Sequence, residues 1–287
     1  MQNTDTTTVD TTTVDTKDEA EETLLSSGDD AEVKEAKPTA DMGEIDSMFK
    51  AGVHYGYSRR SRHPKTRPYI FTTKNNVEIF DLEKVDGKIK EVEEFVKGLA
   101  KEGKVVLFVG TKPEAKEAVL ETAKDINMPF CIERWLGGTF TNFSNIRKRM
   151  DYFEGLKETK TTDKWLKYTK KERSEFDKDI EKMERFFGGL VSLKKKPDAV
   201  VIIDAKYEEV AKDEALKSAV PVISLINSDN NPTGIDYPVV GNDATRSSIK
   251  YFLDRIGKAY KAGATMKVTD VPKVEKVEDE KELTKSE

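Results

Sequence analysis

The stretch "KVVLFVG", Lys104–Gly110, decides the fold class of this chain. Its five central residues are all apolar, and an uninterrupted apolar run is typical of a strand that is buried on both faces of a parallel sheet. Pro113 suits the first turn of a helix, and it predicts a helix that continues through about Asn127. The stretch is therefore the strand of a β–α unit.

The same pattern repeats on both sides of this strand. Further strands are predicted at "NNVEIF" (Asn75–Phe80), "MPFCIE" (Met128–Glu133), "DAVVIIDA" (Asp198–Ala205) and "VPVISLIN" (Val220–Asn227). Helices are predicted over 82–99 and 209–218, and Asn242 or Asp243 can cap a last helix. Repeated β–α units with apolar strands predict an α/β domain in which helices cover both faces of a parallel sheet.

One long segment interrupts this rhythm between the third and fourth predicted strands. Apolar residues at helical spacing form two narrow seams, over 143–153 and 176–190, and the charged stretch 157–175 separates them. Such seams predict a protruding antiparallel α-helical coiled-coil hairpin over 143–190. The alternative is a pair of ordinary surface helices that lie on the sheet.

Charge is distributed unevenly along the chain. The formal net charge is −5, but residues 1–48 hold 14 acidic residues and 3 lysines, and residues 267–287 hold 7 and 5. The part between them has 41 basic and 33 acidic residues, which gives a net charge of +8. A basic body of this kind points to a polyanionic partner.

The two ends differ from the body in composition. The acidic first part, with its tandem "TTTVD", is too poor in apolar residues to form a core, and the last part reads as a loose tail. We therefore predict a disordered acidic extension over 1–44 and a flexible tail over 265–287. The α/β domain then comprises 45–142 and 191–264, with the hairpin over 143–190 between them.

The segment Phe49–Val77 is the most unusual part of the body, because it holds seven Lys or Arg residues and no Asp or Glu. Guanidinium groups match phosphate oxygens, and tyrosine rings offer faces on which bases stack. Core packing is nevertheless the favoured interpretation of Tyr55 and Tyr69. The alternative for the whole segment is an ordinary solvated loop, although ordinary surfaces mix charges of both signs.

Signatures of catalysis are missing from the sequence. The turn after the Lys104–Gly110 strand lacks the glycine patterns of nucleotide-binding loops, so a simple strand-to-helix turn is favoured over a phosphate site at Thr111 and Lys112. Two histidines, His54 and His63, are too few for a zinc site. The single cysteine lies in an apolar run and is interpreted as a core residue. No enzyme, metal, cofactor, small-molecule substrate or membrane span is predicted.

A further motif, "ERWLGGTFTNFSNIRKRM", spans Glu133–Met150. Its glycine pair permits a tight turn, and Thr141 or Asn142 can cap the first hairpin helix. Arg147–Arg149 is a basic run. Trp135 is interpreted as a core anchor in preference to a base-stacking residue.

These motifs together resemble a known family. "FKAGVHYGYSRRSRHPKTRPYIFTTKNNVEIFDLEK", "VLFVGTK", "RWLGGTFTN", "PDAVVIIDA" and "VPVISLINSDNNPTGIDYPVVGND" occur in the order found in bacterial ribosomal protein S-two, over about residues 45–262. The resemblance implies a doubly wound, flavodoxin-like sheet with a protruding hairpin. It also implies a cytoplasmic ribosomal protein without catalysis that binds small-subunit ribosomal RNA near the junction of head and body, and that contacts ribosomal protein S-one and neighbouring small-subunit proteins.

The basic runs and the resemblance together define the predicted RNA-binding residues. They are Arg59, Arg60, Arg62, Lys65, Arg67, Lys74, Lys112, Arg134, Asn142, Arg147, Lys148 and Arg149. The chain departs from the family at Tyr57, where a histidine is common, and at Arg62–His63, where Trp-Asn is common. Two alternatives remain: a nucleotide-binding enzyme on a Rossmann-like sheet, and a non-ribosomal scaffold that acts through its hairpin.

Overall fold

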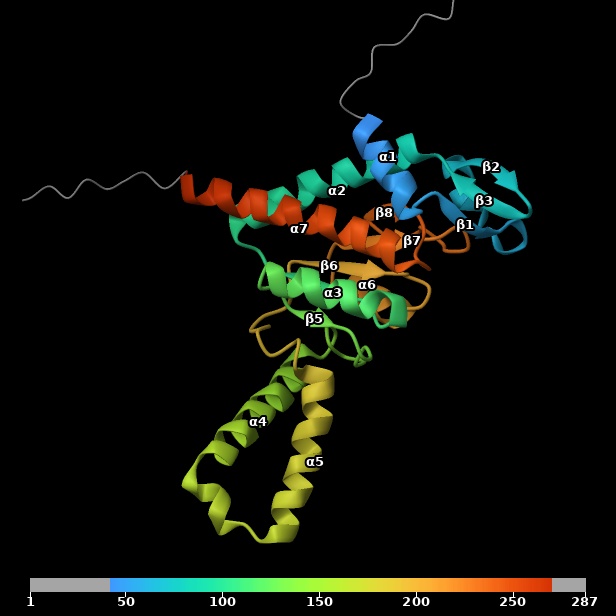
Figure 1. Ribbon diagram of the computed structural model, residues 1–287. Coiled ribbons are helices and arrows are strands. Elements are labelled where there is room, and N and C mark those ends of the chain that lie inside the picture. Colours follow the sequence, from blue (N-terminus) through green and yellow to red (C-terminus); the bar gives the residue numbers. More distant parts are fainter. Residues whose placement is uncertain (1–41, 270–287) are drawn as a thin grey trace, which may run out of the picture. The chain divides into compact units, whose positions relative to one another are not determined.

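The computed structural model describes residues 42–269, so the predictions for the acidic extension up to residue 41 and for the tail from residue 270 lie outside the described residues. Figure 1 shows the elements, which follow one another as α1 Met42–Ala51, β1 Tyr55–Ser58, η1 Arg59–Ser61, η2 Pro64–Tyr69, β2 Ile70–Lys74, β3 Val77–Phe80, α2 Leu82–Glu102, β4 Val106–Val109, α3 Pro113–Asp125, β5 Phe130–Cys131, α4 Phe143–Thr161, η3 Asp163–Lys167, α5 Lys170–Phe187, β6 Ala199–Ile203, α6 Glu209–Lys217, β7 Val222–Ile226, β8 Tyr237–Val240 and α7 Arg246–Thr269. The η elements are single turns or short runs of 3-10 helix.

Five parallel strands form the central sheet, in the order β5-β4-β6-β7-β8. Counted along the chain within this sheet, the order is 2-1-3-4-5, which is the flavodoxin-like arrangement. Every residue of β4, β6 and β7 is buried. The apolar runs therefore predicted parallel strands covered on both faces, and this prediction is confirmed.

Helices cover the sheet on both faces. The crossover through α3 runs from β4 to β5, and the crossover through α6 runs the opposite way across the sheet, from β6 to β7. Because such crossovers are right-handed, the two helices lie on opposite faces. Helix α7 packs against α2 and α3 (Figure 1), and the apolar stripe predicted for α2 is buried. The domain is thus doubly wound.

The strand predicted at 75–80 forms, but its place in the parallel sheet was predicted wrongly. It is β3, the central strand of a separate antiparallel sheet with the order β1-β3-β2. The fifth parallel strand is β8, which is short and contains Pro238 at the sheet edge, where a proline is tolerated.

The predicted cap of α7 is wrong. Helix α7 begins at Arg246, and the side chain of Asn242 instead accepts a hydrogen bond from the amide of Ala244 (2.9 Å), while Asp243 pairs with Lys112. Asn142 is the N-cap residue of α4, as predicted, but its side chain makes no capping hydrogen bond.

Helices α4 and α5 form the predicted helical pair. Lys157 pairs with Glu184 and Lys160 pairs with Asp177 (2.7 Å), so a residue later in α4 contacts a residue earlier in α5. The two helices are therefore antiparallel, and Figure 1 shows them leaving the α/β sheet together. The regular seam packing of a coiled coil stays a prediction.

Candidate nucleic-acid interface

The carboxyl ends of the parallel strands are where a flavodoxin-like sheet binds ligands, at the switch point between its first and third strands. In this chain those strands are β4 and β6, and they are followed by Lys112 and Asp204. The Lys112 ammonium pairs with the Asp204 carboxylate and also with Asp243 (3.1 Å). A cation of the chain itself therefore occupies the switch point.

The electrostatics of this buried cluster do not suit an anionic ligand. Burial would lower the pKa of Lys112, but the hydrogen bond that it donates to Asp204 and the charge of Asp243 raise it, so the ammonium stays charged. Burial would raise the pKa of Asp204, but hydrogen bonds from Lys112 and Asn230 lower it. For Asp243, burial and the Asp204 charge raise the pKa. Two carboxylates facing one ammonium repel a phosphate.

The start of α3 is occupied as well. The Glu208 carboxylate accepts hydrogen bonds from the amide (2.9 Å) and the hydroxyl of Thr111, where a phosphate would otherwise bind. Lys112 is therefore not free to bind a nucleotide phosphate or an RNA phosphate at this end of the sheet.

The buried cluster holds the segment that carries most of the predicted RNA-binding residues. Asp243 accepts a hydrogen bond from the Asn227 amide (2.8 Å), and Asn227 in turn accepts one from the backbone N–H of Tyr57 (3.1 Å). The carbonyl of the next residue, Ser228, accepts from the backbone N–H of His63 (2.8 Å). Residues at the switch point thus hold the backbone of this segment at Tyr57 and His63.

We call residues 55–80, which contain β1, η1, η2, β2 and β3, the basic arm. Four of its cations are exposed and have no side-chain partner among the described residues: Arg59, Arg60, Arg67 and Lys74. The other two are engaged, because Arg62 pairs with the buried carboxylate of Glu78 (3.1 Å) and Lys65 donates to the Thr233 hydroxyl. The structure therefore leaves four free cations on the arm.

The remaining predicted residues lie around the start of α4, which leaves the five-stranded sheet at a different place from the basic arm (Figure 1). Arg134, Lys148 and Arg149 are exposed there. Arg147 is not free, because it donates to the carbonyl of Val191 (2.9 Å) and pairs with Glu154 (2.8 Å). The predicted set thus divides into two separate groups.

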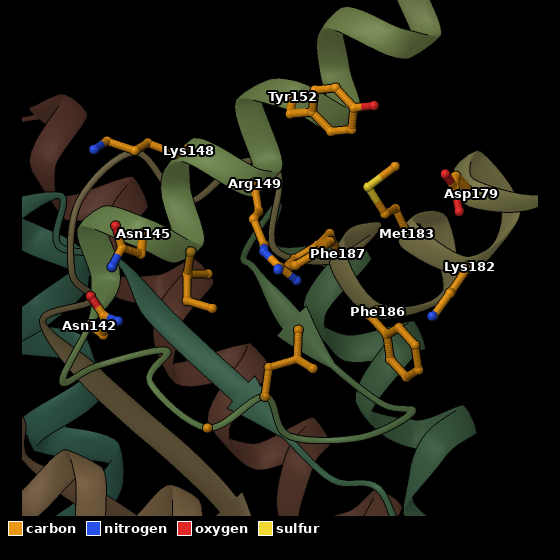
Figure 2. Close-up of a pocket in the computed structure, with 13 residues that line it drawn as sticks. Asn142, Asn145, Lys148, Arg149, Tyr152, Asp179, Lys182, Met183, Phe186 and Phe187 are labelled. Atoms are coloured by element: carbon orange, nitrogen blue, oxygen red, sulfur yellow. The ribbon is translucent and has the colours of Figure 1, made fainter. Parts of the chain in front are cut away.

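A groove of about 980 Å³ lies between α4 and α5 beside the second group. Figure 2 shows the side chains around it, with Lys148 and Arg149 leaving α4 in different directions. Its apolar lining includes Ile146, Met183 and Phe187. The groove therefore combines an apolar lining with a rim that is mostly basic.

The motif around Gly137–Gly138 is organised by a residue that the sequence analysis missed. The Glu214 carboxylate of α6 accepts hydrogen bonds from the backbone N–H of Gly138 (2.6 Å) and of Phe140 (3.0 Å). Gly138 has φ +93°, a conformation that glycine adopts readily. Trp135 is 8% exposed and packs on Phe140, with 5.1 Å between ring centres, which confirms its interpretation as a core residue.

Fold and site together define the class of this protein. It is a doubly wound α/β protein whose ligand edge is closed by its own side chains and whose separate basic arm carries four free cations. Cys131 is buried, and burial raises the pKa of its thiol to about 12, which does not suit a nucleophile. Within residues 42–269, no cluster of metal-binding side chains is present, and no helix is long and apolar enough to cross a membrane.

Comparison with known proteins identifies the family. The family model described as Ribosomal protein S2 matches residues 48–263. The chain is 39% identical over 220 residues to small ribosomal subunit protein uS2 of Dictyoglomus thermophilum, which covers 77% of this chain and 89% of that protein. It is 38% identical to uS2 of Nitratiruptor sp. over 226 residues, 79% of this chain and 85% of the relative. For uS2 of Amoebophilus asiaticus the identity is 36% over 223 residues, with 78% and 71% covered.

The chain therefore belongs to the ribosomal protein S2 family. The resemblance inferred from the motifs is confirmed. This family is structural and not enzymatic, so a nucleotide-binding enzyme is not favoured.

Proposed function

We propose that the chain is a structural constituent of the small ribosomal subunit, acts in translation in the cytoplasm, and binds small-subunit ribosomal RNA through its basic arm. The family supports the first part of the proposal. The RNA contact near the junction of head and body is the finer part. RNA binding by the arm is supported by one observation, namely four exposed cations without partners on a segment that has no acid from Phe49 to Val77. The place near the junction rests on the family resemblance alone.

The chemistry of these cations matches a phosphate backbone. Guanidinium groups donate two parallel hydrogen bonds to phosphate oxygens, and three of the four free cations are arginines. An internal ion pair would weaken such a contact, because the cation would have to leave its partner first. We therefore exclude Arg62, Lys112 and Arg147 from the proposed phosphate contacts. On the arm we keep Arg59, Arg60, Arg67 and Lys74, while the exposed Arg134, Lys148 and Arg149 stay predicted RNA-binding residues outside the arm.

A charge-removal experiment tests the arm. The triple variant Arg59→Gln, Arg60→Gln, Arg67→Gln keeps polarity and removes three exposed charges. Binding to purified small-subunit ribosomal RNA is measured as a function of salt concentration, and assembly is followed by sedimentation with small subunits. The slope of log affinity against log salt should flatten by roughly three units, and the variant should sediment poorly with subunits.

The matched control removes the same charge elsewhere. Lys194, Lys195 and Lys196 form another exposed basic run, outside the arm. Their conversion to Gln should leave most of the salt slope in place. If the arm variant keeps the wild-type slope and assembles normally, the arm is not the RNA contact.

We further propose that the groove between α4 and α5 receives a neighbouring small-subunit protein, with ribosomal protein S-one as the candidate. The apolar lining and basic rim support this proposal, because protein interfaces combine an apolar centre with a polar rim. Met183→Asp places a carboxylate in the lining. Capture of purified ribosomal protein S-one by the assembled subunit should fall, while arm-dependent RNA binding stays at the wild-type level. Unchanged capture contradicts the proposal.

A further inference from the structure

The basic arm displays apolar rings as well as cations, and phosphate binding does not account for them. Of the ten large apolar side chains that are exposed in the described part, Tyr55, Phe71 and Val77 lie on the arm and Phe49 lies just before it in α1. Phe71 is 75% exposed and Tyr55 is 51% exposed. Exposed apolar residues are ordinary when they are scattered singly, but here three of them lie on one small three-stranded sheet.

The strand register places one of these rings on a solvent-facing sheet surface. Tyr55 and Thr72 both lie opposite Ile79, and Lys74 lies opposite Val77. Residues that face each other across antiparallel strands share a face, as do residues two apart along a strand. All five therefore lie on one face, and none of them is buried.

The opposite face of the same sheet is the buried one. Glu78 and Phe80 alternate with Val77 and Ile79 along β3, and both are almost fully buried. The face with Glu78 and Phe80 therefore packs against the rest of the protein, and the face with Tyr55 is open to solvent. Phe71 lies at the irregularity of β2 between Ile70 and Thr72, and β2 is an edge strand.

Ring packing holds Tyr55 in place. The imidazole of His54 stacks on Phe49, with 4.4 Å between ring centres and 7° between ring planes, and lies 4.0 Å from the ring of Tyr55. Burial lowers the pKa of His54, so the imidazole is neutral at pH 7. Phe49 itself is 61% exposed. The three rings form a packed series with an exposed ring at each end.

We propose that the exposed rings of Tyr55, on the outer face of the β1–β3–β2 sheet, and of Phe71, on its edge strand β2, stack unpaired RNA bases. The proposal rests on the proposed RNA binding and adds the chemical class of the ligand: a single-stranded segment, since paired bases do not offer a free face to a protein ring. Charge complementarity selects RNA over a protein partner, because the segment Phe49–Val77, which supplies both rings, carries the free cations Arg59 and Lys74 and no acid.

The test removes the aromatic rings and keeps apolar side chains. Phe71→Leu and Tyr55→Leu keep an apolar side chain and remove the aromatic face, while Phe71→Tyr keeps the ring. Affinity is measured with the full chain for purified small-subunit ribosomal RNA and for a single-stranded oligoadenylate. Each Leu variant should bind about 5-fold to 100-fold more weakly at every salt concentration, with an unchanged salt slope, and Phe71→Tyr should bind like wild type.

A matched control and two outcomes make the test decisive. Tyr207 is 59% exposed on the α/β unit outside the arm, so Tyr207→Leu should bind both RNAs normally. If wild type binds ribosomal RNA with a steep salt slope but the Leu variants bind equally well, the stacking inference is overturned and the phosphate contacts stand. If wild type does not bind ribosomal RNA at all, the proposed function fails together with this inference.

Discussion

Lys112→Met tests whether the closed switch point is a structural device. The ammonium of Lys112 lies between the carboxylates of Asp204 and Asp243, whose side chains are 10% and 0% exposed, and the lysine side chain is itself 14% exposed. Methionine preserves most of the volume and removes the charge. Two buried carboxylates then face each other without a counter-ion.

The expected loss of stability follows from the partners that remain. Removing one member of a buried ion pair costs about 3–5 kcal/mol. Asp204 keeps hydrogen bonds from Asn230 and from the backbone N–H of Lys206, and Asp243 keeps one from Asn227. We therefore expect the lower end, about 3 kcal/mol, which lowers the melting temperature by about 6–12 °C for a domain of this size.

The assay is urea unfolding of the full chain, followed by circular dichroism at neutral pH. Lys250→Met is the matched control, because Lys250 is exposed and pairs with Glu121 (2.7 Å) on the surface, where an ion pair adds little stability. The control should unfold at the wild-type urea concentration. If Lys112→Met loses less than about 1 kcal/mol, the buried pair contributes no more than a surface pair does, and the reasoning is wrong.

Two further predictions concern single carboxylates. The pKa of Asp204 is lowered from 3.8, so its contribution to stability is fully present above that value and is lost as the pH falls through its lower folded-state pKa. The stability advantage of wild type over Asp204→Asn, measured by urea unfolding across pH, should therefore be constant above about pH 5 and shrink below pH 3.8. An advantage that grows in acid would contradict the assignment. Glu214→Gln replaces one carboxylate oxygen that faces backbone N–H groups with an amide, so it should cost about 1–3 kcal/mol in the same assay, while the exposed Glu209→Gln on the same helix should unfold like wild type.

Much of the α/β domain was predictable because its signals are local. The apolar runs of β4, β6 and β7 and the stripe of α2 depend on residues a few positions apart, and all four elements formed as predicted. The family motifs added the flavodoxin-like order. The helical pair was predictable in the same way, from two seams and a charged connection.

The place of β1 in the antiparallel sheet was not predictable from local pattern. Strand β1 is short, lies beside basic residues, and pairs with β3 across the two intervening 3-10 elements, whereas only the turn Asn75-Asn76 separates β2 from β3. The favoured interpretation of Tyr55 as a core residue was wrong for this reason, because only the pairing places its ring on the outer face. Tyr69, in contrast, packs against the core.

The predicted site was only partly predictable, because ion pairs join residues that are distant in sequence. Lys112 and Asp243 lie 131 positions apart, and Arg62 and Glu78 lie 16 apart. The sequence does not show whether a basic residue is free to bind RNA or is paired with a buried acid elsewhere in the fold. Burial and partners therefore separate the free cations Arg59, Arg60, Arg67 and Lys74 from those that hold the fold together, while their contact with RNA stays a prediction.

The closed switch point and the open arm are physically connected. A sheet of this order ordinarily leaves the ends of its first and third strands free for a ligand. Here Lys112 and Asp243 occupy that position, and Asp243 orients Asn227, which holds the backbone of Tyr57 at the base of the arm. Because a binding surface is more effective when its contacts are ordered in advance, the position that serves ligand binding in other flavodoxin-like proteins serves in this chain to hold the arm against the sheet.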